Sequence, residues 1–178
     1  MNRNTRCFVT MAMAMAAVSC SDSTGPSAVG GPHSYTVTGD LEGTFEGNAA
    51  VFGLQANEQG IGQWFINTLE VVGNSIQGVS IVYNGQNPGT GTFAIENVDM
   101  QELPSNAFGA FLSLVANAED AGYIGNSISG TITISESSST TVKATFEFAA
   151  AGIALPPSGP SESANVLVIG QVDAIPAN

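Results

Sequence analysis

Basic residues are almost absent from this chain. Its 178 residues include 3 Lys and Arg against 15 Asp and Glu, and the one histidine is His33. The resulting negative charge repels phosphate backbones and anionic lipid headgroups, which argues against nucleic acid as a partner. Only 10% of the residues are charged, unlike the charge-dense composition of disordered acidic tails. We therefore expect a folded body whose surface is acidic and rich in small polar residues.

Cysteine is equally scarce, and both cysteines, Cys7 and Cys20, lie near the start of the chain. The residues beyond them can form no disulfide, and with one histidine they cannot supply the four Cys and His ligands of a structural zinc site. His33 follows Pro32 in a segment rich in Gly and Pro, where we expect a flexible tether. A tether would not hold the imidazole rigidly enough for a Ser-His-Asp triad.

The N-terminus has the three parts of an export signal. Arg3 and Arg6 come first, an uncharged run of about a dozen residues follows, and small residues precede Cys20. The run is too short to cross a hydrocarbon core of roughly 30 Å. We therefore predict a signal peptide over residues 1–19, whose removal would leave Lys143 as the one Lys or Arg of the mature chain.

The end of this signal resembles a lipobox, with the sequence Ala17-Val-Ser-Cys20. The resemblance implies that Cys20 is lipidated and holds the protein to a membrane, although Ala17 departs from the leucine that is most common there. An ordinary secretory signal, with Cys20 left as a free thiol, is the alternative. In the sorting rule of enteric bacteria, an Asp directly after the lipidated cysteine retains a lipoprotein at the inner membrane. Ser21 stands there instead, so we expect the outer membrane rather than the inner.

Residues 20–33 are rich in Gly, Pro and Ser and predict a flexible linker. From residue 34 to residue 178, short segments of alternating polarity are separated by Gly, Asn and Pro. This pattern predicts an all-β domain, a single antiparallel β-sandwich or flattened barrel of about nine strands. The expected strands are residues 35–45, 49–55, 63–72, 75–83, 90–96, 108–116, 127–135, 142–150 and 164–174.

The clearest pair is 127–135 with 142–150, joined by a turn at residues 136–140. Successive side chains of a strand point to opposite faces. We therefore expect the isoleucines of the first strand to point inward and its Ser and Thr residues outward, namely Ile128, Ile132 and Ile134 against Ser129, Thr131, Thr133 and Ser135.

One segment is ambiguous, because the apolar residues of 108–116 fit a helix as well as a strand. Ser105 or Asn106 would cap such a helix, whereas Gly109 disfavours it. We predict a strand. The only tryptophan, Trp64, is expected in the core.

Three segments of the β-domain carry a family resemblance: Gly89-Thr-Gly-Thr-Phe-Ala-Ile95, Ser129-Gly-Thr-Ile-Thr-Ile134 and Val142-Lys-Ala-Thr-Phe-Glu-Phe148. In this order they resemble a family of small bacterial cell-envelope lipoproteins of unknown function. The resemblance spans roughly residues 39–174. It implies an all-β envelope lipoprotein, and it supplies no catalytic residue because its motifs are those of strands and turns.

Carboxylates are the only reactive groups present in quantity. Asp40, Glu42 and Glu46 alternate with apolar residues, which places them on one face of the first expected strand. They would form a solvated face, bind a ligand or calcium through their oxygens, or act as a catalytic pair on a glycosidic bond. The sequence contains no calcium-loop motif, and we predict no other metal or cofactor.

These features favour a lipid-anchored bacterial envelope protein that acts as a non-enzymatic binding or structural module. Its partners would be the membrane, through the lipid on Cys20, and an envelope protein or glycan. The alternative is a carbohydrate-active enzyme that uses paired carboxylates in a β-sandwich cleft.

Overall fold

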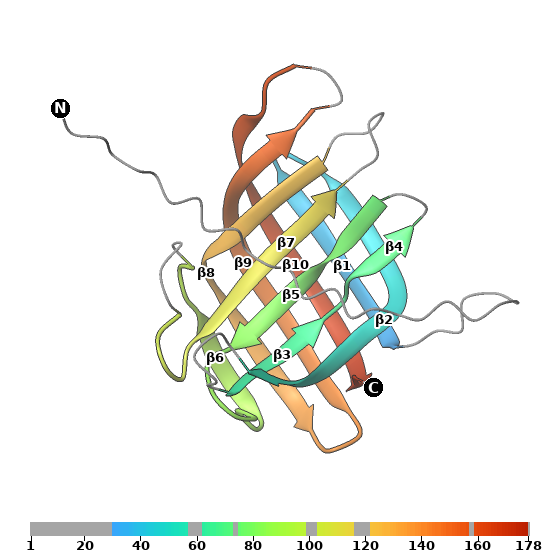
Figure 1. The fold of residues 1–178 in the computed structure, drawn as a ribbon, viewed down its shortest axis with the longest axis vertical. Helices are drawn as coiled ribbons and strands as arrows, with labels where there is room; N and C mark the ends of the chain where they lie inside the picture. Colours follow the sequence, from blue (N-terminus) through green and yellow to red (C-terminus); the bar gives the residue numbers. More distant parts are fainter. Residues whose placement is uncertain are drawn as a thin grey trace, which may run out of the picture.

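The protein is all-β over the residues that the computed structural model describes, which are 30–56, 62–72, 75–98, 103–115, 122–156 and 159–177. These residues form ten strands (Figure 1) and no helix. In this part of the chain, therefore, nothing helical is long and apolar enough to span a membrane. The strands are β1 (Gly31–Gly39), β2 (Gly43–Ala56), β3 (Gly62–Asn67), β4 (Glu70–Val72), β5 (Ser75–Tyr83), β6 (Gly91–Ile95), β7 (Phe108–Val115), β8 (Gly122–Ser137), β9 (Val142–Leu155) and β10 (Glu162–Pro176).

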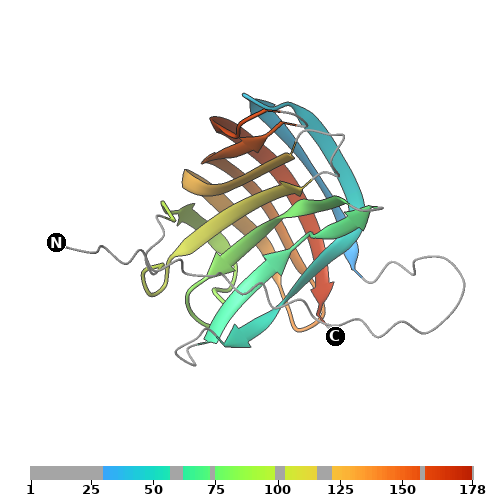
Figure 2. The same ribbon diagram turned by 45° about the horizontal axis from the view of Figure 1, so that its top comes forward.

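All ten strands belong to one sheet, in the order β3-β2-β1-β10-β9-β8-β6-β7-β5-β4. A further pairing joins β3 to β5, so the sheet curls into a ring (Figure 2). Most neighbours are antiparallel, and two short parallel pairs, β2 with β10 and β6 with β7, make the sheet mixed. The all-β prediction is thus confirmed, with one strand more than expected.

The first expected strand, 35–45, is wrong as a single element. It is a hairpin, because β1 ends at Gly39 and β2 begins at Gly43. Gly39 has φ of +117°, a backbone conformation that residues with a Cβ rarely adopt, so the chain turns there. At its other end β1 begins at Gly31, which puts His33 in a strand and not in a tether.

The expected strand 63–72 is also two strands, β3 and β4, interrupted at Thr68 and Leu69. The Thr68 hydroxyl replaces part of the backbone ladder here. It accepts a hydrogen bond from Val79 N at 2.8 Å and donates one to Val79 O at 3.1 Å. These side-chain hydrogen bonds interrupt the backbone pairing and separate β3 from β4, which accounts for the additional strand.

The ambiguous segment is a strand, as predicted. β7 pairs with β5 along all its 8 residues, from Phe108 opposite Tyr83 to Val115 opposite Ile76. Asn106 precedes it in a turn with φ of +61°, a left-handed conformation that an asparagine tolerates. Asn106 therefore belongs to the turn that leads into β7 and does not cap a helix.

One side chain of β8 faces the opposite way from the prediction. Ile132 and Ile134 are buried as expected, whereas Ile128 is 41% exposed. The pairing of β8 with β9 shifts register between Ser127 and Ser129. Such a bulge adds one residue and reverses the alternation, so Ser127 points inward and Ile128 outward.

The core fills the interior of the ring. Trp64 is 2% exposed, as predicted, and its ring packs at nearly a right angle to that of Phe108, with a ring-centroid distance of 6.4 Å. Because directly paired residues of a sheet share a face, the strand register places side chains in rows across the sheet. One row of the inner face, here called the inner row, consists of Phe45, Tyr35, Gly170, Phe146, Ile132 and Phe93.

Candidate functional site: a polar groove on the outer face

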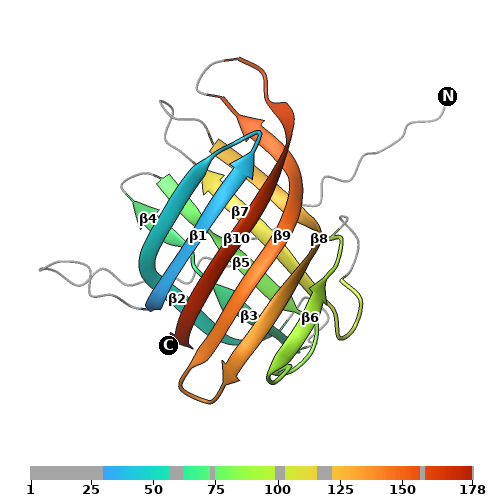
Figure 3. The ribbon, with the colours of Figure 1, turned by 180° about the vertical axis from the view of Figure 1, so that it is seen from behind.

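The outer face of the ring carries a matching row of polar side chains over β2, β1, β10, β9, β8 and β6, six strands that lie side by side in Figure 3. Each member is directly paired with the next across a strand boundary. This set, here called the outer row, consists of Glu46, Ser34, Gln171, Thr145, Thr133 and Thr92. At its far end the hydroxyls of Thr92 and Thr133 lie 2.9 Å apart, within hydrogen-bond distance.

A second row lies beside it, one pleat along the same strands. Its members are also outward and exposed, and they are Thr44, Thr36, Ile169, Glu147, Thr131 and Ala94. On the other side of the outer row, Asp173 of β10 is paired with Lys143 of β9, which in turn is paired with Glu136 of β8. Charged side chains therefore lie on both sides of the outer row, namely Glu147 on one side and Asp173, Lys143 and Glu136 on the other.

Two hollows, of about 730 and 550 Å³, lie along these rows. They adjoin, because Ser34, Glu46, Thr145 and Gln171 line both. We call the combined depression the outer groove. Ser34 and Thr145 have short side chains, whereas Glu46 and Gln171 are longer and rise beside them. Hydroxyl, amide and carboxylate oxygens therefore line one continuous depression that spans several strands.

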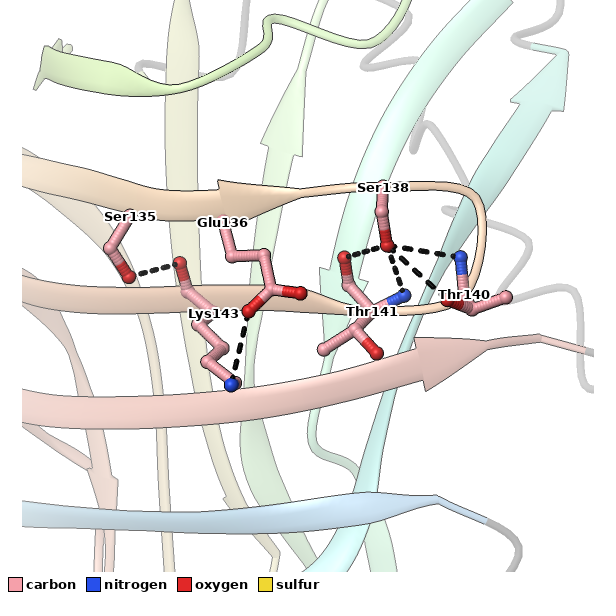
Figure 4. Close-up of polar contacts among 6 residues, drawn as sticks. All are labelled: Ser135, Glu136, Ser138, Thr140, Thr141 and Lys143. Carbon is pink, nitrogen blue, oxygen red and sulfur yellow. Dashed lines mark hydrogen bonds and ion pairs between the residues drawn. The ribbon is translucent and has the colours of Figure 1, made fainter.

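The charge of the outer groove is negative. Glu46, Glu147 and Asp173 contribute carboxylates, and Lys143 is the one Lys or Arg among the described residues that line it. Lys143 Nζ lies 3.0 Å from Glu136 Oε2 (Figure 4). The hydrogen bond to Glu136 raises the pKa of Lys143, and the charges of Glu136 and Asp173 add to the effect. This cation is therefore engaged by neighbouring carboxylates, and the groove disfavours anions.

The turn between β8 and β9 closes one end of the two strands, as Figure 4 shows. The hydroxyl of Ser138 accepts hydrogen bonds from Thr141 N at 2.9 Å and Thr140 N at 3.3 Å, and it donates to Thr141 O at 3.1 Å. The predicted turn is therefore confirmed in place but starts two residues later than expected, because Glu136 and Ser137 still belong to β8. These bonds fix the hairpin that carries Glu136 and Lys143 to the groove.

The three predicted carboxylates do not share a strand face. Asp40 and Glu42 lie in the turn between β1 and β2, and only Glu46, in β2, reaches the outer groove. Asp40 ties the turn to β10, because its Oδ2 accepts a hydrogen bond from Asn165 N at 2.7 Å. No three His, Cys, Asp or Glu side chains of the described ranges gather in a way that could hold a metal ion. Cys20 lies outside the described residues.

Sequence reasoning also missed a polar cluster around His33, which is buried on one side and exposed at Asn48 on the other. Glu70 of β4 extends over Gly47, where a Cβ would collide with its carboxylate, and its Oε1 accepts a hydrogen bond from Asn48 N at 3.0 Å. Buried His33 stacks on Tyr35 at a ring-centroid distance of 6.1 Å. Burial lowers the pKa of His33, and the nearby charge of Glu70 opposes this. Burial raises the pKa of Tyr35, and Glu70 adds to that effect.

Most residues of the outer groove were also missed by sequence reasoning. Ser34, Thr145 and Gln171 are unremarkable in their own segments, and only the alternation of polar and apolar residues marks them as outward. Comparison with protein-family models, with curated proteins and with solved structures finds no match to this chain.

Proposed function

We propose that this protein is a lipid-anchored component of the bacterial envelope and that its β-ring is a non-enzymatic binding module. The observation that carries the binding role is the outer row, where polar side chains from six strands line up across one face and border a groove. Hydroxyl and amide groups both donate and accept hydrogen bonds. Such a surface presents a partner with a regular series of bonding groups.

The anchoring role is supported by the sequence alone. The Ala17-Val-Ser-Cys20 segment resembles a lipobox, and Ser21 favours the outer membrane. A lipid on Cys20 would keep the groove at the membrane, where its partner would be an envelope protein or a glycan.

The anchor is tested by the intact mass of the protein from membranes and of a Cys20→Ala variant, with fractionation of both. We expect a lipid-sized mass increment and membrane association that are both lost in Cys20→Ala. A soluble mature chain of unmodified mass would contradict the proposal and indicate a secreted β-domain with a free thiol.

One observation favours a second function, carbohydrate-active catalysis. Glu46 and Glu147 line the same hollow, and two carboxylates are the usual machinery of glycoside hydrolysis. Glu46→Gln and Glu147→Gln would abolish turnover of a glycan substrate in an enzyme while leaving the fold intact. A binding module would show no turnover in either the parent chain or the variants.

A further inference from the structure

The outer row has the dimensions of a short extended chain. It crosses six strands, and five steps of about 4.8 Å between neighbouring strands give a length of about 24 Å. An extended peptide rises about 3.3 Å per residue, so about seven residues would cover the row. Apart from Glu46, which only accepts, the side chains of the row both donate and accept hydrogen bonds, which suits the alternating donors and acceptors of a peptide backbone.

Carboxylates lie around the outer row on three sides. Glu46 stands at one end of the outer row, Glu147 stands in the neighbouring row on one side, and Asp173 stands on the other side. Lys143, paired with Asp173 and held by Glu136, offsets part of this charge. Glu46 and Glu147 have no ion pair with a described residue. A ligand that lies along the row is thus complementary in charge only if it is cationic.

Among its described lining residues, the groove offers a sugar ring no exposed aromatic face. Tyr35 and Phe146 lie beneath it, but their exposures are 2% and 3% because both rings point into the core. The large apolar side chain on its outer surface is Ile169, which is 49% exposed. Sugar-binding β-domains gain much of their contact area from exposed aromatic faces, so these residues favour a peptide over a glycan.

We propose that the outer groove binds an extended segment of a partner protein that bears lysine or arginine, with the backbone along the outer row and cationic side chains toward Glu46 and Glu147. This inference rests on the proposed binding function and names the occupant of the same groove. Aliphatic parts of the segment would contact Ile169, and the hydroxyls of Thr145 and Thr133 would bond its backbone.

The test is titration of the full chain with three probes: a heptapeptide of alternating lysine and serine, one of alternating glutamate and serine, and a neutral linear glucose hexasaccharide. We expect the lysine peptide alone to bind, with an affinity that falls as salt rises. Each of Glu46→Gln and Glu147→Gln should weaken it by up to about fivefold, the upper range for an exposed ion pair.

A matched control separates the groove from the general acidity of the protein. Glu162→Gln removes the same charge from an exposed residue of β10 that lies outside the groove, and it should leave the affinity nearly unchanged. The proposal is overturned if Glu162→Gln weakens binding as much as the groove variants do, if the lysine peptide does not bind, or if the hexasaccharide binds instead. Binding of the hexasaccharide would support the binding function but identify a different ligand. An unmodified Cys20 would refute the membrane anchor without affecting the peptide-binding test.

Discussion

Gly170→Ala should destabilise the protein although it adds only a methyl group. Gly170 lies in the inner row between Tyr35 and Phe146. A Cβ there would stand 2.5 Å from Phe146 Cζ and 2.7 Å from Tyr35 Cβ, whereas carbon atoms prefer separations of about 3.5–4.0 Å. The aromatic ring of Tyr35 cannot easily yield, because it already stacks on Phe45 at 4.9 Å. We expect a loss of about 1–3 kcal/mol in the free energy of unfolding, the usual cost of overpacking a core.

Gly62→Ala is the matched control, because a Cβ at Gly62 meets no described residue within 4 Å. It should be neutral or stabilise by up to about 1 kcal/mol through the unfolded chain. Urea unfolding followed by the fluorescence of buried Trp64 measures both variants. Each kcal/mol should also move the melting temperature by about 2–4 °C. Equal stability of the two variants would show that the rings do not close over Gly170, and the packing argument would fail.

Three further predictions concern Tyr123, His33 and Glu70. Burial raises the pKa of Tyr123 to about 12, with a smaller contribution from the charge of Asp40. The hydroxyl therefore loses its proton at lower pH in the unfolded chain than in the folded one, and the free energy of unfolding should fall as pH rises from about 10 to 12. Tyr123→Phe should remove that part of the alkaline loss and, since the hydroxyl has no partner among the described residues, cost nothing at neutral pH; a clear loss there would reveal a missing bond. Burial lowers the pKa of His33 below its ordinary 6.5, so the unfolded chain takes up the proton first and stability should fall as pH drops below about 6.5, by at most about 1.4 kcal/mol per pH unit. His33→Phe keeps an aromatic ring beside Tyr35 and should abolish this slope in urea melts between pH 7.5 and 5.5; an unchanged slope would assign it to the carboxylates. Glu70→Ala should cost at most about 1 kcal/mol, because it removes the acceptor of Asn48 N in an exposed hydrogen bond that water can partly replace. Glu70→Gln, which keeps an oxygen there, should cost less by thermal unfolding.

Periodicity predicted the strands well where side chains alternate without interruption. The expected strand 75–83 coincides with β5, and the predicted hairpin of 127–135 with 142–150 forms as β8 and β9. The failures have local causes that alternation does not reveal. The positive φ of Gly39 breaks the first strand, and the bulge after Ser127 turns Ile128 outward.

The groove was beyond sequence reasoning because it depends on pairings between distant segments. Ser34 is paired with Glu46 in its own hairpin, but also with Gln171 near the end of the chain. Of its acidic residues, Glu46 was predicted as a candidate. Glu147 and Asp173 were not, because each is a single acidic residue within an expected alternating strand. Only strand order and register bring these residues to one face, and neither can be read from a single segment.

The same register builds the core and the groove. Every member of the outer row is adjacent in sequence to a member of the inner row, as in Glu46 beside Phe45, Gln171 beside Gly170 and Thr145 beside Phe146. Side chains alternate between the two faces of the sheet. A shift of any of these strands by one residue in its pairing register would therefore bury a polar side chain and, at the same time, remove its oxygen from the groove. Stability and binding should therefore be coupled at the inner row. Gly170→Ala, which presses on Tyr35 and Phe146, should displace their neighbours Ser34 and Thr145 and weaken ligand binding, whereas Gly62→Ala should leave binding unchanged.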